Sequence, residues 1–207
     1  MTSDFDIRLS IWLFLGFIVA TIIGTLTHEC GHYLVAKSFG YDATLHYGST
    51  NWRPSNANQN TNHSSFWILV GGPLETMLTG TIGLILLFSF RKSFDNITKL
   101  SFRQWFIIFV SLFWLRQTAN LVVWIGRYVV SGNYSFRSDE IRVAKYLQLP
   151  DLTFSILTAI IGAIVLTIVI FKFVPAKQRL TFIFSGVAGG ISGYILWLVL
   201  FGKYLMP

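Results

Sequence analysis

The 207 residues carry a net charge of +7 and are 53% hydrophobic but only 12% charged, with a mean hydropathy of +0.59. Several apolar runs approach or exceed the roughly 20 residues that a helix needs to cross a bilayer, which excludes an ordinary soluble domain. The basic residues fall mostly in connecting segments, so we expect contact with the lipid bilayer and no nucleic-acid binding. A single cysteine excludes an internal disulfide.

The apolar runs predict an all-α integral membrane protein, a single transmembrane domain over residues 1–207 built as a polytopic bundle of about five helices. The expected spans are residues 9–39, 66–90, 105–130, 154–174 and 180–205. After the first span the sequence loosely alternates apolar and polar residues, which leaves room for a short β-hairpin. We therefore expect a multi-pass protein of a cell membrane, and the loop charges weakly favour an N-terminus on the inside.

The first span carries the pattern His-Glu-x-x-His at 28–32, preceded by a long apolar run. Because they are four residues apart on a helix, His28 and His32 point the same way. Two imidazoles in this arrangement can hold one zinc ion, with Glu29 beside it to handle a water proton. Ionisable groups inside a membrane span are costly and usually functional, so this pattern is the first candidate site.

The second span contains Gly-Gly-Pro-Leu-Glu at 71–75. We expect Gly72 and Pro73 to interrupt the helix and free backbone groups, which is tolerated where the backbone is buried or lines a wet cavity. Glu75 lies at membrane depth, where it could bind metal, pair with a cation or shuttle protons.

The third span places Arg116 and Asn120 on one helix face. A lone Arg at membrane depth needs a partner, and Glu75 is the expected one, although a direct catalytic role for either residue stays open. Beyond this span, Ser-Asp-Glu at 138–140 is typical of a helix start. Asp139 is then either a favourable carboxylate in the first turn or the third zinc ligand, with Glu75 as the alternative ligand.

The last span has small residues at fourfold spacing, in the pairs Gly186/Gly190 and Gly189/Gly193. Such pairs let helices approach closely, either within the bundle or between copies of the chain. A homo-oligomer through one of these pairs is therefore one prediction.

Together these motifs resemble the site-2-protease-like intramembrane zinc metalloproteases, the M50 peptidase family. The match is specific at 28–32, moderate at 71–74 and weak around Asp139, and it covers roughly residues 20–147. The chain has Glu75 where the family usually has Asn, and no Gly follows Asp139. The resemblance implies cleavage of membrane-embedded protein substrates, a substrate-positioning role for Gly72 and Pro73, and a first loop that faces the cytosol, opposite to the loop charges.

The leading hypothesis is an intramembrane zinc metalloprotease acting on membrane-embedded or membrane-proximal proteins. The metal would be zinc, held by His28, His32 and Asp139, and Glu29 would be the general base. Asn120 would help to stabilise the oxyanion.

Two alternatives remain open at this point. The first is a proteolytically inactive membrane protein that keeps the zinc site for structure or sensing, which the incomplete second and third motifs suggest. The second is a transporter that uses Glu75, Arg116 and Asn120 as an intramembrane polar path.

Overall fold

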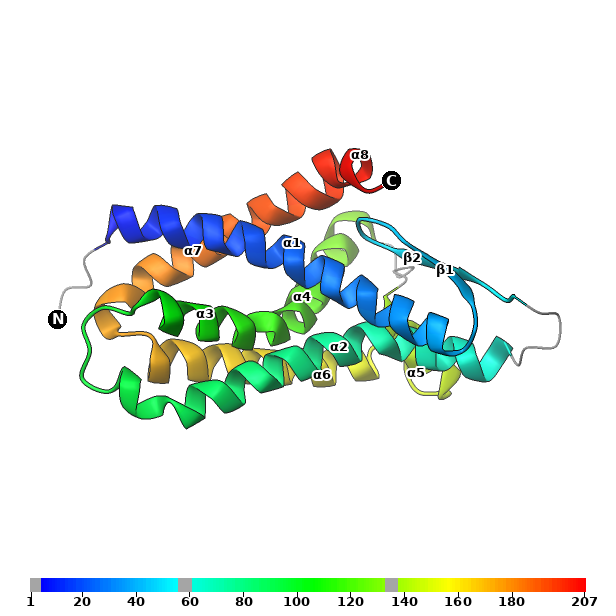
Figure 1. Cartoon of the computed structure of the whole chain (residues 1–207), viewed down its shortest axis with the longest axis horizontal. Coiled ribbons are helices and arrows are strands. Elements are labelled where there is room, and N and C mark those ends of the chain that lie inside the picture. The colour runs from blue at the N-terminus through cyan, green and yellow to red at the C-terminus, as the bar shows by residue number, and fades with distance from the viewer. Residues whose placement is uncertain (1–4, 56–60, 133–137) are drawn as a thin grey trace.

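Helices dominate the part of the chain that the computed structural model describes, which is residues 5–55, 61–132 and 138–207 (Figure 1). In chain order the elements are α1 (Ile7–Ser38), β1 (Asp42–Leu45), β2 (Thr50–Arg53), α2 (Thr61–Ser89), α3 (Phe102–Ser111), α4 (Leu115–Ser131), α5 (Asp139–Tyr146), α6 (Thr153–Ile168), α7 (Ala176–Tyr194) and α8 (Gly202–Leu205). Irregular helical turns join several of them: 3₁₀ at Arg91–Phe94 and Leu112–Trp114, and π at Val169–Phe173 and Ile195–Phe201.

Five helical stretches within the described residues are long and apolar enough to cross a membrane. They are Ile7–Ser38, His63–Ser89, Phe102–Ser131, Thr153–Phe173 and Ala176–Leu205. The expected all-α bundle of five spans, with a short hairpin after the first, is therefore confirmed. This architecture is consistent with a multi-pass membrane protein.

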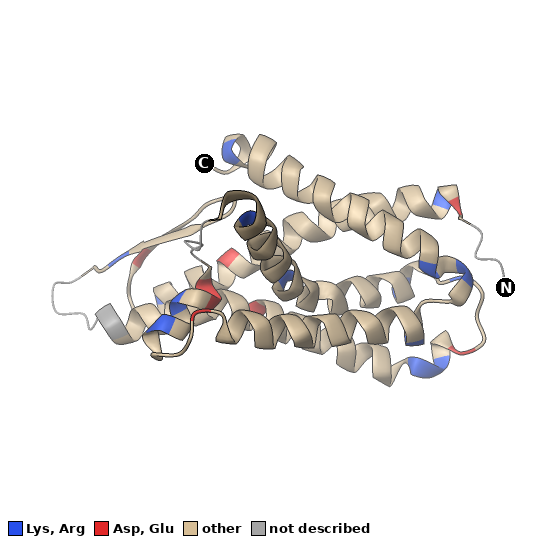
Figure 2. Ribbon diagram, turned by 180° about the vertical axis from the view of Figure 1, so that it is seen from behind, with Lys and Arg blue, Asp and Glu red and all other residues tan. Residues whose placement is uncertain are grey.

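Charge is distributed as a membrane setting requires. Figure 2 shows basic and acidic residues gathered near the two ends of the bundle and around one internal group of segments. Large apolar side chains stay exposed along the spans, such as Trp12 at 70% and Ile82 at 56%. A buried cluster that includes Phe17, Trp105 and Phe182 packs the inside of the bundle. Exposed apolar flanks and a packed interior suit lipid as the surrounding solvent.

Helices α1 and α2 meet backbone to backbone where two glycines face each other. A Cβ atom on Gly31 would lie 2.4 Å from the Gly71 carbonyl oxygen, and one on Gly71 would lie 2.7 Å from that of Gly31. Small residues allow such close approach, and in lipid close packing is a main source of helix association. The crossing brings the histidine face of α1 directly onto α2.

Helix α2 runs without a break through Pro73, so the expected interruption at Gly-Gly-Pro is wrong. Proline removes one backbone N–H, and the carbonyl four residues earlier, that of Leu69, loses its helical donor. A membrane helix tolerates this when neighbouring groups satisfy the freed positions. The next carbonyl back, that of Ile68, accepts a hydrogen bond from His32 on α1 instead of facing lipid.

Helix α7 packs on α1 through its glycines. A Cβ atom on Gly189 would lie 2.6 Å from the Phe14 carbonyl oxygen, and one on Gly193 would lie 2.9 Å from Thr21 Cβ. The Gly189/Gly193 pair therefore serves packing within the chain. Gly190 faces open space, and an oligomer through the Gly186/Gly190 pair stays a prediction.

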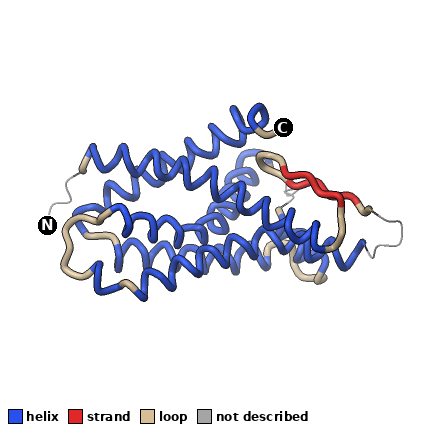
Figure 3. The backbone as a smooth tube through the Cα atoms, viewed as in Figure 1, coloured by secondary structure: helices blue, strands red, loops and turns tan. Residues whose placement is uncertain are grey.

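The hairpin lies beside the C-terminal end of α1, and α8 approaches its turn (Figure 3). β1 and β2 are antiparallel, with Asp42 opposite Arg53 and Leu45 opposite Thr50. Trp197 Nε1 donates to the Tyr47 carbonyl at 2.7 Å, and the Tyr47 N–H donates to the Met206 carbonyl at 3.1 Å. The end of the last span thus holds the turn between the two strands.

Candidate metal centre

His28 and His32 lie one turn apart on α1 and face α2. They are 1% and 4% exposed, and their ring centroids are 4.9 Å apart. The rings fit because position 72 has no side chain: a Cβ atom there would lie 2.4 Å from His32 Nε2 and 2.7 Å from His28 Nε2. The absence of a side chain at Gly72 thus leaves the space that both imidazole rings occupy.

Each ring is held at its Nδ1 atom by a group on α2. His28 Nδ1 lies 2.9 Å from Thr76 Oγ1, whose own proton goes to the Gly72 carbonyl. His32 Nδ1 lies 2.6 Å from the Ile68 carbonyl, which can only accept, whereas the Gly72 N–H is farther away at 3.3 Å. Both Nδ1 atoms therefore act as donors, and a neutral ring then presents an unprotonated Nε2. This outer support is typical of metal-binding histidines.

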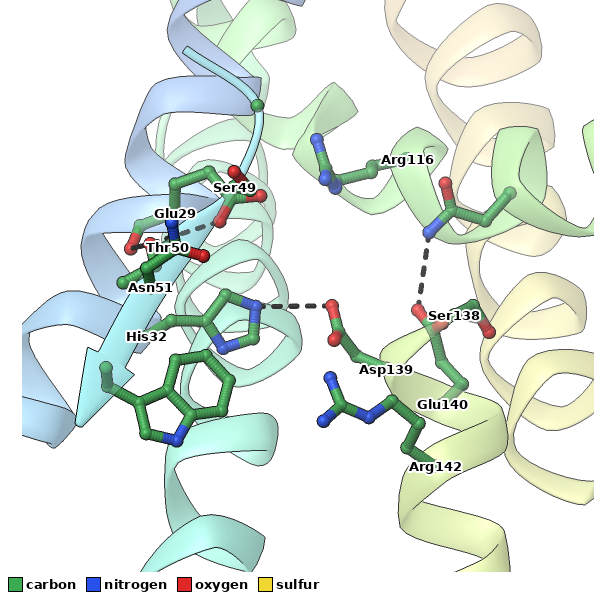
Figure 4. Close-up of a pocket in the computed structure, with 13 residues that line it drawn as sticks. Glu29, His32, Ser49, Thr50, Asn51, Arg116, Ser138, Asp139, Glu140 and Arg142 are labelled. Carbon is green, nitrogen blue, oxygen red and sulfur yellow. Dashed lines mark hydrogen bonds and ion pairs between the residues drawn. The ribbon is translucent and has the colours of Figure 1, made fainter. Parts of the chain in front are cut away.

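The two Nε2 atoms meet one carboxylate. Asp139 Oδ2 lies 3.2 Å from His28 Nε2 and 3.2 Å from His32 Nε2, and Figure 4 shows His32 and Asp139 facing each other. Bare nitrogen lone pairs and a carboxylate repel unless a proton or a metal ion lies between them. Ligands at the usual zinc distances in a tetrahedron are about 3.3 Å apart, so this donor set fits a metal of that kind.

Helix α5 aims the Asp139 carboxylate. The Ser138 side chain caps the helix by accepting from the Ile141 N–H at 3.3 Å, which places Asp139 in the first turn. The expected helix start at 138–140 is therefore confirmed. Burial raises the pKa of Asp139, but hydrogen bonds from His28 and His32 outweigh it and hold that pKa below its ordinary value. These hydrogen bonds require a proton between the carboxylate and Nε2, in the place that a metal ion would take.

Glu29 completes a buried group that could hold a metal ion. Donor atoms of His28, Glu29 and His32 all lie within 4.8 Å of one another. Glu29 is itself held by the hairpin, since Thr50 Oγ1 lies 2.8 Å from its backbone oxygen and 3.1 Å from its carboxylate Oε2. The Glu29 carboxylate is therefore fixed beside the imidazoles by β2.

A polar cavity of ≈ 670 Å³ opens onto these groups (Figure 4). It lies between α1, the hairpin, α4 and α5. Its lining residues are Glu29, His32, Gly48, Ser49, Thr50, Asn51, Trp52, Arg116, Asn120, Ser138, Asp139, Glu140 and Arg142. Such a lining admits water, which a hydrolytic site within a membrane would require.

The expected ion pair between Glu75 and Arg116 is not formed. The two side chains have different neighbours: Glu75 packs against Gly31 at the crossing of α1 and α2 and accepts from Thr79 at 2.9 Å. Arg116 lines the cavity instead. No ion pair within 4.0 Å joins them among the described residues. Within the described residues, one Glu75 oxygen bonds Thr79 and the other has no hydrogen-bond partner, so neither bonds a histidine.

The polar residues of the third span therefore do not form one path with Glu75. Arg116 Nη1 makes a long hydrogen bond of 3.5 Å to Thr25, and its buried Nε has no partner in the described part of the chain. Asn120 Nδ2 donates to Glu140 at 3.3 Å. Arg116 and Asn120 share the cavity, and Glu75 does not line it.

Gly72 and Pro73 lie behind the histidines. Both are buried in α2, and neither lines the cavity. Gly72 supports the imidazoles. The Cβ distances at Gly72 give the reason, since any side chain there would displace the rings. The substrate-positioning role of Gly72 and Pro73 stays a prediction.

The structure adds residues to the site that sequence reasoning did not select. They are Thr50 and Trp52 on β2 and Glu140 and Arg142 on α5. Trp52 stacks near His32 with ring centroids 6.4 Å apart, and Glu140 is only 5% exposed. The loose alternation of the hairpin is the one signal in the sequence that bears on Thr50 and Trp52.

Comparisons of the chain with models of protein families, with curated proteins and with solved structures found no match.

Proposed function

We propose that this chain is an intramembrane zinc metalloprotease of the site-2-protease-like kind. The observation that supports the proposal best is the single carboxylate oxygen of Asp139 at 3.2 Å from the Nε2 atoms of both His28 and His32. These three residues would hold the ion. Glu75 is the weaker candidate for third ligand, because its carboxylate bonds Thr79 on the far side of the helix crossing.

The catalytic roles fall to the polar side chains near the site that would not hold the metal ion. A bound zinc ion would acidify a coordinated water toward a pKa of about 7 and polarise the substrate carbonyl. Glu29, held by Thr50, takes the proton from the attacking water and passes it to the leaving amine. Asn120 lies across the cavity, where its amide is available to position the carbonyl oxygen beside its bond to Glu140.

Strand β2 offers a way to present an unwound peptide. Among the described residues it pairs with β1 in a two-stranded sheet, so no described strand occupies its other edge. Three of its four residues line the cavity: Thr50, Asn51 and Trp52. A substrate strand added there would hydrogen-bond along β2 and pass in front of Glu29.

The test is zinc content followed by cleavage, using the whole chain in lipid nanodiscs. We expect about one zinc per chain in the wild type and in Glu75→Ala, and loss of zinc in Asp139→Ala. Glu29→Gln should keep zinc and lose cleavage of a membrane substrate by at least roughly 100-fold, because general-base catalysis contributes about 10²–10⁴-fold.

Each result has a contrary outcome. Retention of zinc in Asp139→Ala with loss in Glu75→Ala would exchange the two ligands. Undiminished cleavage by zinc-loaded Glu29→Gln would remove Glu29 from the mechanism. Stoichiometric zinc without cleavage of any membrane protein would favour the structural or sensory alternative.

A further inference from the structure

Arg116 is a cation at membrane depth whose donors are mostly unused. The guanidinium has five N–H donors, yet the described residues supply one long contact, 3.5 Å to Thr25 Oγ1. In the part of the chain that the structure describes, the buried Nε has no hydrogen-bond partner and no carboxylate lies within ion-pair distance of Arg116. A cation in this setting is normally paired or functional.

The side chain extends into the cavity rather than toward lipid. Figure 4 shows Arg116 reaching across the space toward Glu29 and Ser49, and Arg116 is part of the lining. The cavity is not enclosed, so a ligand can enter it. The free donors of Arg116 therefore face the same space as the proposed metal centre.

The three carboxylates that line the cavity together with Arg116 each have another partner. Glu29 is held by Thr50, Asp139 by the two histidines, and Glu140 by Asn120. Glu75 bonds Thr79 and lies outside the cavity. Arg116 is thus left without a dedicated counter-ion.

The net charge of the cavity also favours an anionic ligand. Three carboxylates and two guanidinium groups line it, the second guanidinium being that of the exposed Arg142 on α5. A divalent ion at the histidines turns the net charge of this set from −1 to +1. The loaded cavity is then one negative charge short of neutrality.

We infer that Arg116 binds a carboxylate group of the peptide that enters the cavity. This inference rests on the proposed metalloprotease function. A guanidinium recognises a carboxylate through two parallel hydrogen bonds, and its unused N–H groups suit that geometry. The carboxylate comes either from an Asp or Glu side chain near the cut or from a free C-terminus, and Arg142 at the exposed side of the cavity adds attraction.

The experiment compares three probes that carry a hydroxamate as metal-binding group. They are Ala-Asn amide, Ala-Asp amide and Ala-Asn with a free carboxylate. Binding to the full chain in nanodiscs is measured by calorimetry, once with zinc loaded and once with zinc removed. We expect one of the two acidic probes to bind roughly 10- to 100-fold more tightly than the neutral one, as charge-assisted hydrogen bonds allow. The tighter acidic probe identifies the source of the carboxylate.

The preference should vanish in Arg116→Gln and be partly kept in Arg116→Lys, which retains the charge but not the fork. Arg127→Gln is the matched control, because Arg127 lies on the same helix, is exposed and does not line the cavity. Its variant should keep the full preference.

The outcomes separate the two proposals. Equal, zinc-dependent binding of all three probes by the wild type overturns the role of Arg116 and leaves the metal centre standing. A preference for acidic probes that depends on Arg116 but not on zinc supports the carboxylate site and counts against the metalloprotease. Failure of every probe to bind overturns both.

Discussion

Gly72 allows the two imidazoles of His28 and His32 to lie close together. It lies beneath both rings, and the helix there has an ordinary α conformation, so its value is the space that it leaves. The Gly72 carbonyl accepts the Thr76 proton, which leaves Thr76 Oγ1 to accept from His28. One residue without a side chain therefore organises both imidazole rings.

Gly72→Ala should disturb the site without unfolding the chain. The added methyl group would lie 2.4 Å from His32 Nε2 and must push the ring away. We expect zinc affinity to fall roughly 10- to 100-fold, the range for loss of support around metal ligands. Zinc affinity can be measured by competition with a chelator. Gly24→Ala, which meets nothing within 4 Å on the same helix as the histidines, is the control; an equal loss there would contradict the steric account.

At the scale of elements, the hairpin is only as rigid as its attachment to the last span. The Tyr47 carbonyl accepts from Trp197 and its N–H donates to the Met206 carbonyl. Gly202 makes room for the Tyr47 ring, since a Cβ there would lie 2.6 Å from it. Because β2 holds Glu29 through Thr50, the far end of the chain helps to position the proposed general base.

Trp197→Phe tests this attachment. It removes one hydrogen bond worth about 0.5–1.5 kcal/mol while keeping an aromatic ring. We expect backbone hydrogen exchange in residues 46–52 to become roughly 2- to 10-fold faster, with zinc content unchanged. Trp12→Phe is the matched control, since Trp12 is 70% exposed on α1. Unchanged exchange in Trp197→Phe would show that the strands hold their position without this bond.

At the scale of the whole molecule, α1 is the common partner: α7 packs on one side of it and α2 on another (Figure 1). Both contacts depend on glycine, Gly31 with Gly71 and Gly189 with Phe14. The interior of the bundle is thus set by close backbone approach, as expected where lipid offers no hydrophobic drive between helices.

Gly189→Ala and Gly190→Ala form a matched pair for this packing. The first places a Cβ 2.6 Å from the Phe14 carbonyl oxygen, whereas the second meets nothing within 4 Å. We expect Gly189→Ala to destabilise the fold by about 1–3 kcal/mol, as overpacking does. Thermal unfolding in detergent should show a lower Tm for Gly189→Ala and little change for Gly190→Ala. Equal changes in Tm for the two variants would mean that α7 does not pack on α1 as closely as described.

Much of the fold could be predicted because membrane spans are long apolar runs and caps are local. His28 and His32 share a face from spacing alone, and the Ser138 cap is readable from three residues. Asp139 is different, because its carboxylate meets His28 across 111 positions of sequence. Nothing local says which face α5 turns toward α1, so the choice between Asp139 and Glu75 needed the bundle.

The Glu75–Arg116 pair illustrates the same limit. Spans that are apolar all round give little indication of their rotation, and a 3₁₀ turn at Leu112–Trp114 changes the register just before Arg116. Both charges lie at similar depth, which made the pair reasonable. The two side chains point in different directions, and the depth of a residue in the membrane does not predict the direction of its side chain.

The order in which the ribosome makes the chain gives the 111-residue separation a further consequence. Both histidines and Gly72 are synthesised and inserted with the first two spans, whereas Asp139 follows the third. At about 5–20 residues per second, the imidazoles wait on the order of ten seconds for their carboxylate. During this interval the nascent chain contains His28, Glu29 and His32 but not Asp139. The proposed ligand set is complete only after three spans have entered the bilayer.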